Sequence, residues 1–318
     1  MTERQRRLLY LLVDTYIQTQ TPVPSSTLAE QLSLSPATVR YELIELEQAG
    51  FIAKPHTSAG RIPTRQGFRH YALSKLPPSP FPQATLDRLA QALEGAGARR
   101  EGLLVQVASR LSGYPAVLRL KPQRAPKVLQ VHLSQLSPRQ PSAGSGPERV
   151  LAVAVLEGGR VREVRLELSF TPSEALLAEA ERRLHGPLEL PVSPQKAEGS
   201  PKDTLAMREL LEVIRRAFSQ GSLEEYREGV GLLLSEPEAQ NPVFLRQAIA
   251  KFETSNDETL TPPGGVNLRV GDEGLSLVQA GVAMGDHAGE LSLLGPIRMR
   301  YAQALSVAYG LGQVYMGK

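Results

Sequence analysis

The sequence lacks cysteine altogether across its 318 residues. Disulfide bonds, thiolate catalysis and zinc sites built on cysteine are therefore excluded. A chain without cysteine suits a reducing compartment, so we expect it in the cytoplasm.

Long apolar runs are missing too. No stretch of 18 consecutive apolar residues occurs, so we expect no membrane span and no membrane partner. The first residues, MTERQRRLLYLLVDTYIQ, carry apolar side chains at helical spacing that Asp14 interrupts, and they lack a small-residue cleavage site. We therefore expect a folded segment here and not a signal peptide.

Motifs for catalysis and metal binding are also absent. None of the five histidines stands in an HExxH or other metal-ligand spacing, and there is neither a GxxxxGKS/T phosphate loop nor a GxSxG elbow. We expect His132 to be a structural histidine on a strand, and Asp286, His287 and Glu290 to form a solvated turn. The interpretation is a protein that is not an enzyme and uses no cofactor and no metal ion.

The excess of positive charge is confined to the N-terminal quarter of the chain. Residues 1–75 hold nine Lys and Arg against six Asp and Glu, whereas the remaining residues hold 27 of each sign. The whole net charge of +3 therefore lies in the first quarter. Such an excess is a weak indication of nucleic-acid binding until motifs support it.

The sequence before residue 35 predicts two helices. Thr2 and Gln5 occupy capping-box positions, and apolar residues follow at helical spacing. Ser25 or Ser26 is then expected to cap a short helix that ends at Leu32.

A third helix follows after a tight turn. Ser35 is a favourable N-cap and Pro36 a favourable first helical residue, so we expect a helix to about Ala49, ended by Gly50. Its buried side is predicted to consist of Val39, Leu43 and Leu46.

Together the second and third helices have the pattern of a helix-turn-helix, whose second helix enters the major groove of DNA. Hydroxyl and guanidinium groups there can bind phosphates or base edges, and the N–H groups at a helix start suit a phosphate. The candidate DNA-binding residues on these helices are Ser26, Ser35, Ala37, Thr38, Arg40 and Tyr41.

The segment after the third helix predicts a wing. Phe51–Lys54 is a short strand, and the sequence PHTSAGRIP supplies a polar loop and a return strand. We expect Arg61 at the tip of the wing, where it would enter the minor groove or bind phosphate. Thr64 then caps another helix. The candidate DNA contacts in this region are His56, Thr57, Ser58, Arg61 and Arg65.

The chain beyond the wing predicts an α+β multidomain protein. A winged helix-turn-helix at residues 1–76 is followed by a proline-rich linker at 77–83. Residues 84–172 and 241–318 read as two parts of one α/β domain, separated by a mostly helical insertion at 173–240. Within these limits, helices are expected over 84–93, 103–111, 173–184, 204–218, 223–234 and 296–315. Strands are expected over 117–120, 128–133, 150–156, 161–168, 266–270, 275–283 and 289–294.

Several stretches of the sequence resemble the heat-inducible transcription repressor HrcA family. Three of them, RQRRLLYLLVDTYIQTQTPVPSSTLAEQL, LSPATVRYELIELEQAGFI and PHTSAGRIPTRQGFRHY, match its N-terminal domain. The later stretches LSLVQAGVAM, GELSLLGPIRMRYAQAL and YREGVGLLLSEPE resemble the family's other blocks. The resemblance implies a homodimer that binds an inverted-repeat operator in double-stranded DNA upstream of chaperone genes. It further implies release on heat stress, a GAF-like α/β domain, an insertion that serves as dimerisation segment, and activity assisted by the chaperonin GroEL.

The sequence departs from the family pattern at a few positions. Pro24 and Tyr41 stand where the family usually has Gly and Asn, and Ala239 replaces part of an acidic-aromatic segment. Since Tyr41 is on the candidate reading face, the bases that the protein prefers at one or two positions of the operator are open.

Two other functions remain open at this stage. A ligand-gated regulator would sense a small molecule in its C-terminal domain, and a winged helix can also serve as a protein-interaction module. The block Gly295–Tyr301 admits either a ligand or partner site or a strand-to-helix turn, in which Pro296 starts the helix and Met299 packs inward. We favour the turn, because likeness of fold alone assigns no ligand.

Overall fold

A computed structural model describes residues 1–55, 60–123, 127–136, 148–156, 161–184, 186–187, 201–219, 223–254 and 259–314. The chain forms two compact units. The first unit consists of residues 1–120 and 224–318, and the second of residues 121–223. Each unit has a sheet and a hydrophobic core of its own. The expectation of a protein with mixed helices and sheets is confirmed.

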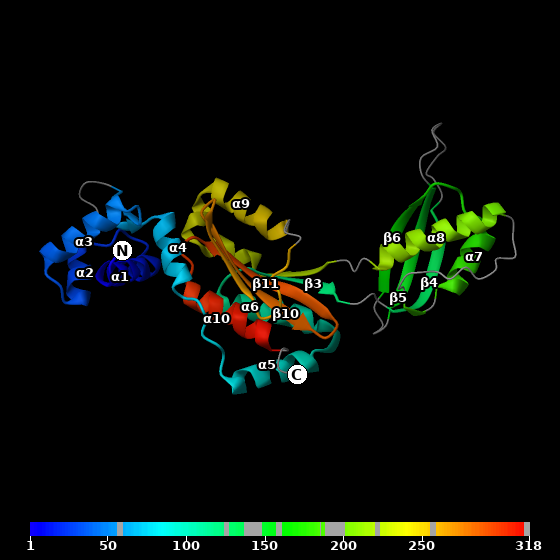
Figure 1. Ribbon diagram of the computed structural model, residues 1–318, viewed down its shortest axis with the longest axis horizontal. Helices are drawn as coiled ribbons and strands as arrows, with labels where there is room; N and C mark the ends of the chain where they lie inside the picture. The colour runs from blue at the N-terminus through cyan, green and yellow to red at the C-terminus, as the bar shows by residue number, and fades with distance from the viewer. Residues whose placement is uncertain are drawn as a thin grey trace. The chain divides into compact units, whose positions relative to one another are not determined.

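The N-terminal part of the first unit is a winged helix-turn-helix (Figure 1). Its elements are α1 (Glu3–Thr19), α2 (Ser25–Leu32), α3 (Pro36–Gln48), β1 (Ile52–Ala53), β2 (Ile62–Pro63) and α4 (Arg65–Leu73). The predicted capping box of Thr2 and Gln5 is present at the start of α1. The predicted cap of α2 is wrong, because Pro24 occupies the N-cap and Ser25 and Ser26 are already helical.

The rest of the first unit is built on a five-stranded sheet of order β8-β3-β11-β10-β9. Its strands are β3 (Ala116–Pro122), β8 (Glu224–Glu228), β9 (Val266–Asp272), β10 (Leu275–Met284) and β11 (His287–Pro296). The helices around it are α5 (Gln83–Gly95), η1 (Gly97–Arg99), α6 (Arg100–Ser112), η2 (Val230–Ser235), η3 (Pro237–Gln240), α9 (Pro242–Glu253) and α10 (Tyr301–Gln313).

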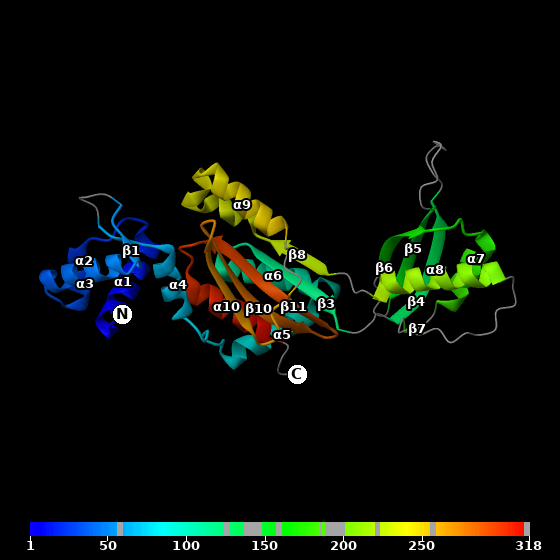
Figure 2. The same cartoon turned by 45° about the horizontal axis from the view of Figure 1, so that its top comes forward.

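The two faces of this sheet have different partners. Because side chains alternate along a strand, Val278 and Ala280 of β10 belong to the large core with α6 and α10. Leu275 and Leu277 point to the other face, where they pack with Phe244 of α9. Figure 2 shows α9 on the side of the sheet opposite α10.

In its described residues, the second unit consists of a four-stranded sheet of order β6-β5-β4-β7 and two helices. Its elements are β4 (Lys127–Gln135), β5 (Glu148–Leu156), β6 (Val161–Leu168), α7 (Glu174–Arg183), β7 (Gly186–Pro187) and α8 (Pro201–Ser219). Val150, Ala152, Ala154 and Leu156 of β5 are buried with α7 and α8, because they share the face that these helices cover.

The domain boundaries differ from those predicted at residues 121–172. The strands β4, β5 and β6 were expected to belong to the same domain as the C-terminal strands, but they form the second unit together with α7 and α8. A strand pattern predicts a strand without specifying which sheet it joins, so the boundary could not be found from periodicity.

The secondary structure also differs from the prediction at two places. A helix was expected over 223–234, but Glu224–Glu228 forms β8, which pairs with β3, and a 3-10 helix follows. Pairing with a sheet edge here overrides helix propensity. The closing helix begins at Tyr301 and not at Pro296, because Pro296 still pairs with Leu275 in β11. Met299 is fully buried, as expected for a strand-to-helix turn.

A buried ion pair fixes the face of the sheet next to α9. Arg119 and Glu290 lie 2.6 Å apart and their side chains are 2% and 1% exposed. Glu290 also accepts hydrogen bonds from the backbone N–H and hydroxyl of Thr261 and from the amide of Gln279. The predicted solvated turn at 286–290 is therefore wrong: Glu290 and His287 are buried in β11.

Replacing Glu290 by Gln is expected to lower the free energy of unfolding by about 3–5 kcal/mol, because the buried Arg119 guanidinium would lose the carboxylate that lies 2.6 Å from it. Urea unfolding of the full chain measures this. The matched control is Glu228→Gln, an exposed carboxylate on the same sheet. Equal, small losses for both variants would contradict the assigned role of the pair.

The stability of the wild type should also depend on pH through this residue. Burial raises the pKa of the Glu290 carboxyl, but hydrogen bonds from Thr261 and Arg119 outweigh burial and hold the pKa below its usual value of 4.5. The contribution of the Glu290 carboxylate to the free energy of unfolding is then complete above pH 4.5. It is lost as pH falls through the pKa of this carboxyl in the folded state. The stability difference between wild type and Glu290→Gln should narrow in acid. A constant difference would count against this account.

Candidate nucleic-acid interface

The rotation of α3 about its own axis is set by its buried side. Val39, Leu43 and Leu46 are buried against α1 and α2, as predicted from their spacing. The N-cap of α3 is Ser35, whose hydroxyl accepts a hydrogen bond from the backbone N–H of Thr38 at 3.1 Å. A buried side and a capped first turn hold one face of the helix toward solvent.

The solvent face of α3 is a continuous strip. Tyr41 is 63% exposed and Ile44 is 47% exposed, at successive turns of the helix. Arg40 lies beside them, and no carboxylate of the described residues is within ion-pair distance of it. The exposed residues of this strip are Pro36, Ala37, Arg40, Tyr41, Ile44 and Gln48.

The structure brings some of the predicted DNA contacts together on this strip and leaves others off it. Ala37, Arg40 and Tyr41 lie on it. Thr38 is half-buried, and its hydroxyl lies 2.8 Å from that of Ser35, so these two hydroxyls are engaged in the cap. Ser26 is exposed in the first turn of α2, on the helix that precedes.

The base of the wing is fastened to the segment before α2. Strands β1 and β2 pair antiparallel, and Arg61 and Val23 exchange backbone hydrogen bonds of 2.8 and 2.9 Å. Gly60 allows this approach, since a Cβ atom there would lie 2.3 Å from the carbonyl oxygen of Val23. The predicted contacts His56, Thr57 and Ser58 fall outside the described residues.

Arg61 is not at the tip of the wing, and that prediction is wrong. Its guanidinium lies 3.0 Å from the carboxylate of Glu47 on α3, and its side chain is only 17% exposed. The hairpin places Arg61 directly before β2, at the base of the wing, where it ties the wing to α3.

Arg65 is also engaged elsewhere. It begins α4, and its Nε donates to the backbone carbonyl of Val270 in β9 at 3.4 Å. Its aliphatic stem covers Gly271, where a Cβ atom would lie 2.7 Å from Cγ of Arg65. The structure therefore joins Arg65 to the sheet domain and does not bring it to the solvent strip of α3.

Two residues of the interface were missed in the sequence. Ile44 follows Arg40 by four residues and Ala37 by seven, so helical phase alone could have placed it on the exposed side. Glu47 could not have been identified, because its pairing with Arg61 depends on how the wing folds back.

Sites for other ligands have little support. In the described parts of the chain no three His, Cys, Asp or Glu side chains are grouped so as to hold a metal ion. None of the helices searched there is long and apolar enough to cross a membrane.

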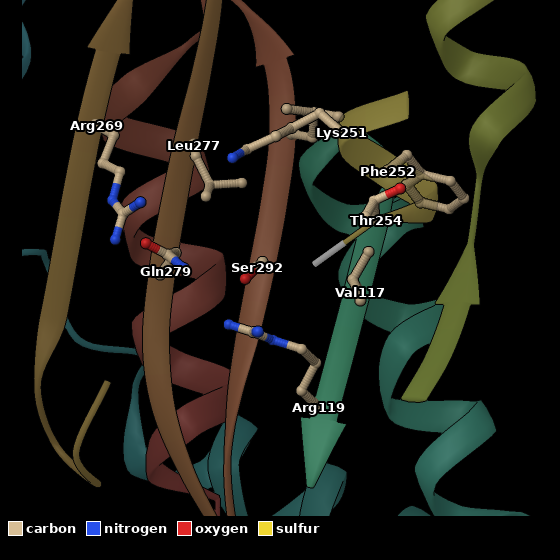
Figure 3. A pocket seen from close by; sticks show the side chains of 10 residues that line it. Val117, Arg119, Lys251, Phe252, Thr254, Arg269, Leu277, Gln279 and Ser292 are labelled. Carbon is tan, nitrogen blue, oxygen red and sulfur yellow. The ribbon is translucent and has the colours of Figure 1, made fainter. Parts of the chain in front are cut away.

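A cavity beside the end of α9 is small. Figure 3 shows Arg119, Lys251 and Arg269 extending toward it from three elements, with Gln279 and Ser292 on the strands beneath. Its volume is about 30 Å³, which accommodates about two water molecules. Pockets for small organic ligands are typically about ten times larger.

A second depression runs along α4 and β9 and has a volume of about 650 Å³. It is lined by Arg65, Gln66, Arg69, Leu268, Arg269 and Val270. Three of these six residues are arginines, whereas pockets for small organic ligands are lined mainly by hydrophobic and aromatic side chains. Neither depression is the apolar pocket with convergent polar groups that a ligand-gated regulator would need.

Known proteins resemble the chain over nearly its whole length. The family model "HrcA protein C terminal domain" matches residues 103–305. The model "Winged helix-turn-helix transcription repressor, HrcA DNA-binding" matches residues 1–76, the limits predicted for the N-terminal domain.

Curated relatives give the same result. The heat-inducible transcription repressor HrcA of Synechococcus sp. (strain CC9902) is 30% identical over 333 residues, covering 96% of this chain and 95% of the relative. That of Anaeromyxobacter sp. (strain K) is 30% identical, covering 96% and 92%. A crystal structure described as a hypothetical protein shares the fold, with a TM-score of 0.58, 21% identity and coverage of 100% and 98%. With family models matched at residues 1–76 and 103–305, the chain belongs to the HrcA family of heat-inducible transcription repressors.

Proposed function

We propose that the chain represses chaperone genes by binding an inverted-repeat operator as a homodimer, with α3 of each protomer in the major groove. The observation that carries this proposal is the solvent strip of α3, where Arg40 and Tyr41 stand exposed beside the helix start. Arg40 supplies a charge for phosphate or guanine, and the helix N-terminus suits a phosphate. Occupancy of the operator would block transcription sterically, in the cytoplasm where the DNA lies.

The inverted repeat follows from two-fold symmetry, since a dimer presents two equivalent recognition helices to two half-sites. Ser26 and the wing residues His56, Thr57 and Ser58 are proposed to contact the flanking backbone. Ser35 and Thr38 are proposed to act by shaping the helix start, where their hydroxyls cap α3. The DNA contact predicted for Arg65 stays a prediction.

We propose that the dimer contact lies on the sheet of the second unit, whose helices α7 and α8 come from the segment 173–240 that the resemblance implies for dimerisation. The face of its sheet that α7 and α8 leave uncovered has an apolar row on β5, in which Leu151, Val153 and Val155 are half-buried. Val161 is the partner of Val155 on the neighbouring strand β6, and it is 67% exposed. Such a row suits burial against a second copy. The sheet of the first unit, with helices on both faces, supports a GAF-like assignment for that domain.

Release on heat stress is proposed to follow from marginal stability. A loss of one or two kcal/mol changes the folded fraction several-fold. A chaperonin of the GroEL type would keep the repressor folded and active at normal temperature. On heat stress other unfolded proteins would occupy the chaperonin, and the repressor would lose its activity. Purified protein that holds its operator unchanged through heat shock, with or without chaperonin, would contradict this part.

The two alternatives have less support. A ligand-gated regulator would need an apolar pocket, whereas the cavity at α9 has a volume of only about 30 Å³ and the groove along α4 and β9 is lined by three arginines. A protein-interaction module needs no exposed arginine at the start of a recognition helix, whereas Arg40 stands there.

Fluorescence anisotropy with an inverted-repeat duplex from a chaperone promoter tests the proposal, with a scrambled duplex as control, at two salt concentrations. We expect tight binding to the repeat alone, and at least tenfold weaker binding for Arg40→Ala, because the variant loses a charged contact. Equal binding of both duplexes, with chaperonin present, would refute it.

The role of Arg61 can be separated from that of Arg40 by mutating its partner. If Arg61 fastens the wing through Glu47, then Glu47→Ala should weaken operator binding as Arg61→Ala does, with an unchanged salt dependence. If Arg61 contacted a phosphate, Arg61→Ala would reduce the slope of log K against log salt by about 0.9. Glu47→Ala would then strengthen binding, since it removes a negative charge.

A further inference from the structure

Ile44 is the exposed aliphatic side chain in the second half of the solvent strip of α3. It is 47% exposed, although Leu43 before it is buried. Arg40 precedes it by one turn and Gln48 follows it by one turn, both exposed. The core of the domain therefore makes little use of this side chain.

Exposure of a single apolar residue is common and by itself assigns no role. The position of Ile44 is what distinguishes it, because it continues the row of Ala37, Arg40 and Tyr41 along one face. If that face enters the major groove, Ile44 enters with it.

The edges of base pairs in the major groove carry one apolar group, the C5-methyl of thymine. Ile44 lies seven residues beyond Ala37, which is about 10 Å along the helix axis. At about 3.4 Å for each base pair, this distance corresponds to about three base pairs. Side chains at the two ends of the strip therefore face different base pairs.

We propose that Ile44 is a specificity-determining residue that reads the C5-methyl of a thymine, about three base pairs from the pair that faces Ala37. The inference rests on the proposed operator binding through α3. It assigns to Ile44 a part of sequence selection that the polar groups of the strip do not supply.

The test replaces each thymine of one operator half-site by deoxyuridine, which removes the methyl group and leaves the pairing edge intact. Anisotropy measures the affinity of the full-length wild type for each duplex. Replacement of the thymine at one position is expected to weaken binding about fourfold, equivalent to about 0.8 kcal/mol. In Ile44→Ala the same replacement should have no effect, because the contact is already absent.

Leu73→Ala is the matched control, since Leu73 is 45% exposed on α4 of the same domain. It should reproduce the wild-type pattern. Ile44→Val, which retains a branched side chain, should retain most of the sensitivity. Equal thermal melting of the three variants and the wild type would show that the fold is unchanged.

The inference is overturned if the repeat is preferred over the scrambled duplex but no deoxyuridine weakens binding. It is also overturned if Ile44→Ala has the same sensitive position as the wild type. Loss of any preference for the repeat would instead contradict the proposed function itself.

Discussion

The burial of one side of α3 is the constraint on which the candidate interface depends. Val39, Leu43 and Leu46 fill the space between α1 and α2, and their position fixes the rotation of the helix. The residues that face solvent are therefore fixed as well. A rotation of α3 by one residue would bury Arg40 or Tyr41. The hydrophobic core of a small domain thus decides which side chains are available to DNA.

Charged groups serve two distinct purposes in the first unit. The pair of Arg119 and Glu290 is buried within the sheet and surrounded by hydrogen-bond donors, so it specifies how segments distant in the sequence meet. The pair of Arg61 and Glu47 lies nearer the surface and joins the wing to the recognition helix. Arg40, in contrast, is exposed on the helix that would meet the DNA. Burial and partners, and not residue type, separate these roles.

Local sequence signals located the N-terminal domain well, because each is read within a few residues. The capping box of Thr2 and Gln5 and the cap at Ser35 are examples. Relations between distant segments could not be read in this way. The pairing of β8 with β3, the burial of Glu290 beside Arg119, and the pairing of Arg61 with Glu47 all depend on tertiary contacts. Ile44 is an intermediate case, since its place on the exposed side of α3 could have been predicted from the helical spacing of the sequence.

The most direct test of the account is photo-crosslinking of the full-length protein to an inverted-repeat duplex that carries bromodeoxyuridine in its major groove. A crosslinking amino acid is placed at Tyr41, on the solvent strip, or at Arg69, exposed on α4. The account predicts efficient crosslinking from position 41 to bases of each half-site and little from position 69. Crosslinking from position 69 alone would show that α3 is not the reading helix.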